Sequence, residues 1–476
     1  MSAADDKSPG SRDVDTSPAF KKMSYRIPEG HAWAGLWKIF AGIGVVGLGI
    51  SAVGYMGDKE RFAFSYLFAF MLFLTVGLGA LFFILIDRLT SAGWSVTVRR
   101  TAEFFAGGLP IFLLLFIPVH GSMGLLFPWL NEHEEAHAKV ELIAPAYAQE
   151  SPATTGAHRE PARGDEPAAP RRSHSLEHAS GAVEGTHAEG ADPEHRIHEE
   201  VMAKKAPYLN RTFFIVRAVI YLLVWSFLAT RLFGFSTRQD TTQDPKLTVA
   251  AQRFAPGATI LFALTLTFAA FDWIMSLNPA WFSTIFGVTI FAGSVVAMYA
   301  TLIVVTMGLR ESGLIKDAIT VEHFHDLGKL MFGFLIFWAY VSFSQFMLIW
   351  YAALPEETTF YHLRWDVGPW KSVSLFIVFA HFVVPFFLIL SRNTKRRLPI
   401  LRLGAMWLLA MHAVEMYWLI MPNYAHGEVS LHWLDATCLL GVGGIYLAAV
   451  FHRMTKHPLI PVGDPRLSRA LSFENA

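Results

Sequence analysis

The chain has 476 residues, of which 53% are apolar and only 16% are charged, and its mean hydropathy is +0.38. These values predict a polytopic membrane protein. Its formal net charge is zero, so the totals do not suggest a nucleic-acid partner. The single cysteine, Cys438, excludes an intrachain disulfide framework, a cysteine-ligated iron–sulfur cluster and a CxxCH haem attachment within this chain.

The alternation of polar and apolar stretches predicts five regions. We expect a polar tail without a cleavable signal peptide at 1–30, three membrane spans within 31–130, a polar insertion at 131–206, seven further spans within 207–455, and a C-terminal tail at 456–476. The ten apolar spans are expected at 36–56, 62–86, 104–129, 212–235, 256–276, 285–307, 328–354, 370–390, 399–421 and 431–451.

Basic residues beside the spans predict the orientation of the chain. Lys and Arg gather in the loops of one side, whereas the opposite short loops hold few of them. Because loops rich in Lys and Arg stay in the cytoplasm, we expect both termini to be cytoplasmic. The basic side is defined by Lys21, Lys22, Arg26, Arg88, Arg99, Arg100, Arg231, Arg238, Lys246, Arg253, Arg310, Lys316, Arg392, Lys395, Arg396, Arg397, Arg402, Arg453 and Lys456.

The 131–206 insertion then falls on the outer side of the membrane. It is rich in Ala, Glu, Pro and Arg and contains eight histidines, a composition that is typical of disordered segments. A His-rich tract can bind metal weakly, but no tight ligand spacing is visible. We therefore expect a solvated insertion rather than a metal site.

The stretch from His325 to Glu357 organises the second half of the chain. Its apolar part, 328–354, is longer than the about 20 residues needed to cross a ~30 Å hydrocarbon layer, and a Pro-Glu-Glu turn follows it. Tyr340, Ser344 and Gln345 lie close enough along a helix to form one polar stripe. This stripe serves either to join neighbouring helices or to carry a function.

Ionisable residues inside the spans are the first functional candidates, because each costs about 2.5–3.5 kcal/mol at membrane depth. On the inner side, Asp87 and Arg88 are expected at the interface, with the arginine reaching out to water. The other candidates are His120, Arg217, Asp272, His381, His412, Glu415 and Asp435.

Two of these candidates, His412 and Glu415, are three residues apart and therefore share one face of a helix. A series of carboxylates, imidazoles and hydroxyls leading inward from one surface is typical of a proton relay or of a quinone contact. Two structural alternatives stay open. Arg217 can pair with Asp272 or Glu415 in a buried ion pair, or His381 and His412 can ligate a b-type haem.

Four stretches of this chain resemble a known family. They are GLGALFFILIDRLTSAGWSVTVRR (77–100), KAPYLNRTFFIVR (205–217), FDWIMSLNPAWFSTIFG (271–287) and HDLGKLMFGFLIFWAYVSFSQFMLIWYAALPEET (325–358). They are similar to the ActF-type membrane subunit of alternative complex III, which is grouped with the NrfD/PsrC-like subunits. The resemblance covers most of 36–451. It implies ten helices, eight of them in two four-helix bundles and two peripheral.

This resemblance implies a quinol:cytochrome c oxidoreductase complex in a bacterial inner membrane. The expected partners are a sister NrfD-like subunit, an iron–sulfur subunit, a multi-haem cytochrome c, a mono-haem cytochrome c and a haem-copper oxidase. Haem c and iron–sulfur clusters would lie in those partners, with menaquinone or ubiquinone as the quinone. No cofactor, metal or catalytic residue is expected here. The family motifs carry over onto Asp272 in DWIMSL, Gln345 in SFSQF, and the Pro-Glu-Glu turn.

Three functions are compatible with these observations. The first is a membrane subunit without a redox centre that provides a scaffold and a proton half-channel or quinone contact. The second is a stand-alone secondary transporter, because Pro110, Pro118 and Pro385 interrupt spans three and eight, although no pairing between two halves is visible. The third is a b-haem-binding anchor. A transporter works alone, whereas a complex subunit depends on partners.

Overall fold

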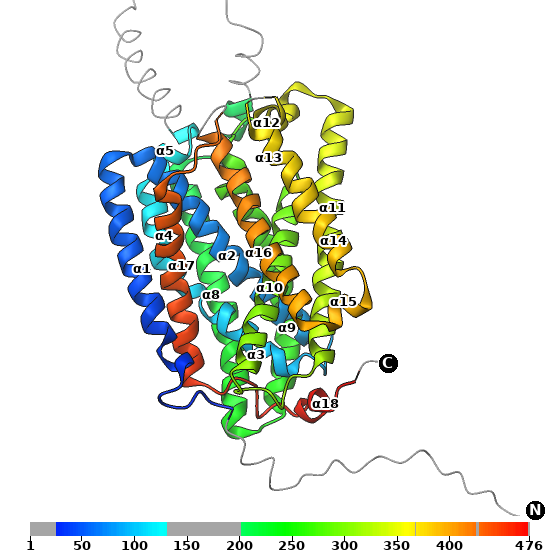
Figure 1. The fold of residues 1–476 in the computed structure, drawn as a ribbon. Helices are drawn as coiled ribbons and strands as arrows, with labels where there is room; N and C mark the ends of the chain where they lie inside the picture. Colours follow the sequence, from blue (N-terminus) through cyan, green and yellow to red (C-terminus); the bar gives the residue numbers. More distant parts are fainter. Residues whose placement is uncertain (1–24, 131–200, 367, 425–427, 475–476) are drawn as a thin grey trace, which may run out of the picture. The chain divides into compact units, whose positions relative to one another are not determined.

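The computed structural model describes residues 25–130, 201–366, 368–424 and 428–474. Most of the expected N-terminal tail and of the His-rich insertion lies outside these residues. The described residues form helices and no strand, and ten helical stretches are long and apolar enough to cross a membrane (Figure 1). The prediction of an all-α, multi-pass membrane protein is therefore confirmed.

Six spans are uninterrupted helices, and four contain a local change of helix type. The uninterrupted spans are α1 (Ala32–Gly57), α2 (Lys59–Leu89), α8 (Arg211–Thr242), α10 (Phe286–Glu311), α11 (Val321–Ala352) and α17 (Trp433–Lys456). Two others end in a 3₁₀ turn: α9 (Lys246–Trp273) with η3 (Met275–Leu277), and α16 (Leu398–Ile420) with η5 (Met421–Asn423).

Spans three and eight are broken in their middle. The third consists of α3 (Val96–Gly107), η2 (Leu109–Ile111) and α4 (Phe112–Gly121), and the eighth of α13 (Trp370–Ile377), a π-helical turn η4 (Val378–Val383) and α14 (Val384–Ile389). Short helices connect or follow the spans: α5 (Met123–Leu126), α12 (Pro355–Trp365), α15 (Arg392–Arg396) and α18 (Leu467–Leu471).

Local sequence explains where several helices begin and end. Asp58 precedes α2 and accepts a hydrogen bond from the backbone N–H of Arg61, while Asn210 does the same for Phe213 in α8. The helix α11 ends where Ala353 adopts a left-handed conformation, with φ of 48°. Pro355 then starts α12, because proline is well suited to the first turn of a helix.

The spans form two four-helix bundles and a peripheral pair. The first bundle contains α2, span three, α8 and α9, and the second contains α10, α11, span eight and α16. The two bundles meet where α2 packs against α10. The first and last spans, α1 and α17, pack along each other at one side of the molecule (Figure 1).

Glycines bring α1 and α17 into backbone contact. A Cβ atom placed on Gly47 would lie 2.5 Å from the backbone N of Gly441 and 2.9 Å from the carbonyl oxygen of Thr437. Gly44 would meet the backbone of Ile445 at 2.6 Å in the same way. Small residues allow helices in a membrane to approach this closely, so van der Waals contact along the backbones joins the two spans.

Both ends of the described chain lie on the same side of the bundle. The backbone N–H of Leu459 donates to the carbonyl of Tyr25, and the Arg26 guanidinium lies 3.4 Å from the Lys456 carbonyl oxygen. An even number of spans places both ends on one side. Which side of a membrane this is stays a prediction from the basic residues.

Candidate functional site

The carboxylate of Glu415 lies at the centre of a buried polar group in the second bundle. Glu415 is in α16, with its side chain 4% exposed. The indole Nε1 of Trp338, from α11, donates to one carboxylate oxygen at 2.5 Å, and Nδ1 of His412 lies 3.2 Å from the other. Glu415 is the 18th of the 23 residues of α16, so the carboxylate lies inside the span.

A threonine of the first bundle fixes the orientation of the His412 ring. Nε2 of His412 lies 2.9 Å from Oγ1 of Thr75 in α2, and that hydroxyl also lies 2.8 Å from the carbonyl oxygen of Leu72. Because a hydroxyl has one proton and here donates it to the carbonyl, it accepts a hydrogen bond from Nε2–H. The remaining nitrogen, Nδ1, therefore faces Glu415, and one proton is shared between the two groups.

The second histidine of the group, His381, lies on the π-helical turn of span eight. Its Nδ1 is 3.9 Å from the Glu415 carboxylate, and its ring stacks on Trp338 with centroids 4.0 Å apart. Pro385 four residues later has no N–H to bond the His381 carbonyl, which favours the irregular turn at this point. The His381 ring is fully buried, and neither of its nitrogens has a hydrogen-bond partner among the described residues.

An unpartnered, fully buried imidazole needs an explanation, because burying a polar group without a hydrogen bond is costly. In this position a water molecule between His381 and Glu415 would satisfy it. A haem between His381 and His412 fits less well. Both rings approach the same Glu415 oxygen, so a carboxylate occupies the space where a bis-imidazole haem would need its iron.

Arg217 and Asp272 form a separate ion pair in the first bundle. The guanidinium of Arg217 donates two hydrogen bonds to the Asp272 carboxylate, at 2.8 Å and 2.9 Å, and Tyr221 donates a third at 2.9 Å. Tyr208 also stacks on the guanidinium, with the ring centroid 3.8 Å from the guanidinium carbon. This is the Arg217–Asp272 pair that the sequence left open as a structural alternative.

The polar stripe expected on α11 is divided between the inside and the outside of the bundle. Gln345 is buried and lies 3.3 Å from Ser283 and 3.4 Å from Tyr361. In contrast, Tyr340 is 66% exposed and Ser344 is half-buried. Only Gln345 of these three therefore faces the interior.

The last two sequence candidates lie elsewhere. Asp435 is paired with Arg61 and accepts a hydrogen bond from Ser65 at 2.6 Å, which ties α17 to α2. His120 is exposed at the end of α4, with its Nδ1 3.3 Å from the sulfur of Met123. The candidates therefore form several groups rather than one continuous chain of hydrogen bonds among the described residues.

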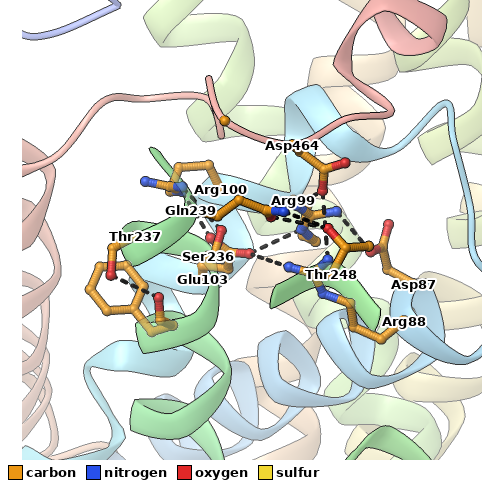
Figure 2. A network of polar contacts seen from close by, with 12 residues as sticks. Asp87, Arg88, Arg99, Arg100, Glu103, Ser236, Thr237, Gln239, Thr248 and Asp464 are labelled. Atoms are coloured by element: carbon orange, nitrogen blue, oxygen red, sulfur yellow. Dashed lines mark hydrogen bonds and ion pairs between the residues drawn. The ribbon is translucent and has the colours of Figure 1, made fainter. Parts of the chain in front are cut away.

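The expectation that Arg88 reaches out to water is wrong. Asp87 and Arg88 are both fully buried in a charged network (Figure 2), in the part of the fold where α18 packs on α3. The network contains four arginines and four carboxylates, and the C-terminal segment covers it. Its members are Asp87, Arg88, Arg99, Arg100, Glu103, Asp240, Asp464 and Arg466.

Arg99 is the centre of this network. Its guanidinium lies 3.0 Å from Asp87, 3.0 Å from Glu103 and 2.7 Å from Asp464, and it is 0% exposed (Figure 2). Burial alone would raise the pKa of the Asp464 carboxyl, but Arg99 and Arg466 outweigh burial and hold that pKa well below its ordinary value. The sequence predicted span three at 104–129, whereas its first helix starts at Val96 and therefore contains Arg99. The helix can hold this arginine because three carboxylates neutralise its charge.

Comparison with known proteins adds no family assignment. No protein-family model matches this chain, and a search of curated proteins also finds no match.

Proposed function

We propose that this chain is a membrane subunit of a quinol:cytochrome c, or quinol:oxidase, electron-transfer complex. It carries no redox centre itself and provides a scaffold and a proton half-channel. The resemblance of 77–100, 205–217, 271–287 and 325–358 to ActF-type subunits supports the assignment to such a complex. In this proposal, the membrane is the bacterial inner membrane, and the 131–206 insertion faces the periplasm.

The observation that carries the proton half-channel is the buried 3.2 Å contact between Nδ1 of His412 and the Glu415 carboxylate. The hydrogen bond to Thr75 uses the Nε2 proton, so His412 and Glu415 exchange a proton across the 3.2 Å contact without a net change of charge. His381 lies next to the same carboxylate and has two unpartnered nitrogens. It can therefore take up the proton after a small movement of its ring, which is how a relay continues.

The Glu415 group supports proton transfer better than direct quinone chemistry. The polar side chains of this group contact one another, because Trp338 and His412 both face the Glu415 carboxylate. A quinone contact would instead need a polar group with a free donor or acceptor towards a cleft, and both ring nitrogens of His412 are already engaged. Gln345 and Tyr361 are a further polar pair, in which the Gln345 amide donates to the Tyr361 hydroxyl, and burial raises the pKa of the Tyr361 phenol to about 12.

Replacement of Glu415 by glutamine tests the relay directly. The amide keeps the shape of the side chain but cannot give up a proton, so proton uptake by the assembled complex should fall at least tenfold. The matched control is Glu311→Gln, which changes an exposed carboxylate paired with Arg402 at 2.7 Å. Equal proton uptake in the two variants, in complexes with intact composition, would refute a relay through Glu415.

Purification in a mild detergent tests the assignment to a complex. Mass spectrometry should identify an iron–sulfur subunit, a sister membrane subunit and haem c proteins with the chain, and a redox difference spectrum should show their haem. A chain that purifies alone and colourless would favour the transporter. A b-type haem band in the isolated chain would instead favour the haem-binding anchor.

A further inference from the structure

A cavity of about 310 Å³ lies between the peripheral pair and the two bundles. Helices α1, α2, α10, α16 and α17 all contribute to its wall, together with Phe105 of α3. At one end lies His412, and most of the wall consists of aliphatic and aromatic side chains such as Phe40, Phe73 and Leu409. Its volume is at the lower end of the range for small-molecule sites in proteins.

The pattern of burial along α2, the central helix, shows that this space is a gap in the packing. Every residue of α2 from 62 to 85 is buried except Leu72, Phe73 and Phe82. Leu72 and Phe73 line this cavity, and Phe82 lines a second apolar cavity of about 260 Å³. Apolar side chains that face an unfilled gap lose van der Waals contacts, so a guest that covers them would be bound favourably.

Water is a poor guest for this cavity, because the polar groups of the wall are already engaged. The Thr301 hydroxyl donates to the Ala297 carbonyl at 2.8 Å, and the Tyr446 hydroxyl donates to the Phe105 carbonyl at 2.9 Å. Both ring nitrogens of His412 have partners, as described above. Since a buried water needs two to four polar partners, the cavity favours a hydrocarbon guest.

One wall of the cavity reaches the outer surface of the bundle. Val304 and Val305 of α10 and Leu409 of α16 are half-buried, although their helices are packed against each other. Neighbouring Leu403 and Met406 of α16 are exposed, as expected for side chains that face lipid. These half-buried side chains mark the part of the wall nearest to the lipid-facing surface of α16.

We propose that this cavity binds one apolar chain from the surrounding membrane, either the acyl chain of a lipid or an isoprenoid chain. The guest covers Leu72 and Phe73 and ends against the His412 ring. It thereby keeps water away from this side of the Glu415 group. This inference rests on the shape and chemistry of the cavity and does not depend on the proposed function.

Photolabelling of the full chain in its native membrane tests this site. Two probes are used in parallel: a phospholipid with a diazirine in its acyl chain, and an isoprenoid alcohol with a diazirine in its chain. We expect one of them to label Phe73 or Leu447, which line the cavity and are half-buried. The probe that labels them identifies the chemical source of the guest. No label on either residue from either probe would overturn the proposal.

A variant in which a larger side chain fills the cavity provides a second test. Leu409→Trp places an indole into the space and should lower labelling of Phe73 and Leu447 at least fivefold. Leu403→Trp is the control, because Leu403 lies on the same helix, is 58% exposed and does not line the cavity. Equal labelling in the two variants would overturn the proposal. If Leu409→Trp does not fold, the wild-type labelling pattern alone decides the question.

Discussion

Replacement of Arg99 by methionine is the sharpest test of the buried charged network. The change removes the guanidinium but keeps a long, flexible side chain of similar reach. Asp87 then loses its nearest cation, whereas Glu103 keeps Arg100 at 2.8 Å and Asp464 keeps Arg466 at 3.2 Å. The next arginine near Asp87, Arg466, is 3.8 Å away, so it does not replace the lost hydrogen bond.

The expected loss of stability follows from burial. Breaking one buried ion pair by removing a single partner costs about 3–5 kcal/mol, because the remaining charge is left without compensation. Arg99 is 0% exposed and has three such partners, so we expect a loss of at least about 3 kcal/mol. The control, Arg402→Met, removes an exposed pair with Glu311 and should cost at most about 1 kcal/mol.

Titration of the detergent-solubilised protein with SDS, followed by circular dichroism, measures both variants under the same conditions. A double-mutant cycle with Asp464→Asn then isolates the coupling between Arg99 and the C-terminal segment, which should amount to about 0.5–3 kcal/mol. A loss in Arg99→Met no larger than that in Arg402→Met would refute the reasoning. It would mean that the network rearranges or that water reaches it.

Three further predictions use the same SDS assay. Asp272→Asn leaves the buried guanidinium of Arg217 without its bidentate partner and should cost about 3–5 kcal/mol, so an unchanged midpoint would contradict a structural role of the pair. Gly47→Leu must push α1 away from α17 and should cost about 1–3 kcal/mol, whereas Gly49→Leu has open space and should be near neutral; equal losses would argue against the close helix contact. Because the folded-state pKa of Asp464 is depressed, its stabilisation is complete above its ordinary pKa of 3.8 and is lost as pH falls below it. The difference in unfolding free energy between wild type and Asp464→Asn should therefore shrink by about 1 kcal/mol by pH 3. A difference that stays constant with pH would refute this assignment.

The fold could be predicted from the sequence because hydropathy and span length dominate in a membrane. Ten apolar stretches were sufficient to give ten spans. The start of span three was missed, since the rule that charges avoid the membrane core excluded 96–103. Arg99, Arg100 and Glu103 are tolerated there because they neutralise each other and are covered by the C-terminal segment.

The candidate site could be predicted only where its residues are close in sequence. The spacing of His412 and Glu415 showed that they share a helix face, and their contact is confirmed. Thr75 is 337 residues away from His412 and Trp338 is 77 residues away from Glu415, so periodicity within one helix could not bring them together. The burial of Arg88 was missed for the same reason, because Asp464 reaches it through tertiary folding alone.

The contact between the first and last spans has a consequence for biosynthesis. The glycine face of α1 leaves the ribosome early, but its partner face on α17 is synthesised almost 400 residues later. Until then, α1 has to wait in the membrane with this face covered by lipid or by a chaperone. A chain truncated before Trp433 never provides the partner helix, and it also lacks Asp464 for the charged network. The same two contacts therefore distinguish a chain that contains α17 and Asp464 from one that is truncated before them.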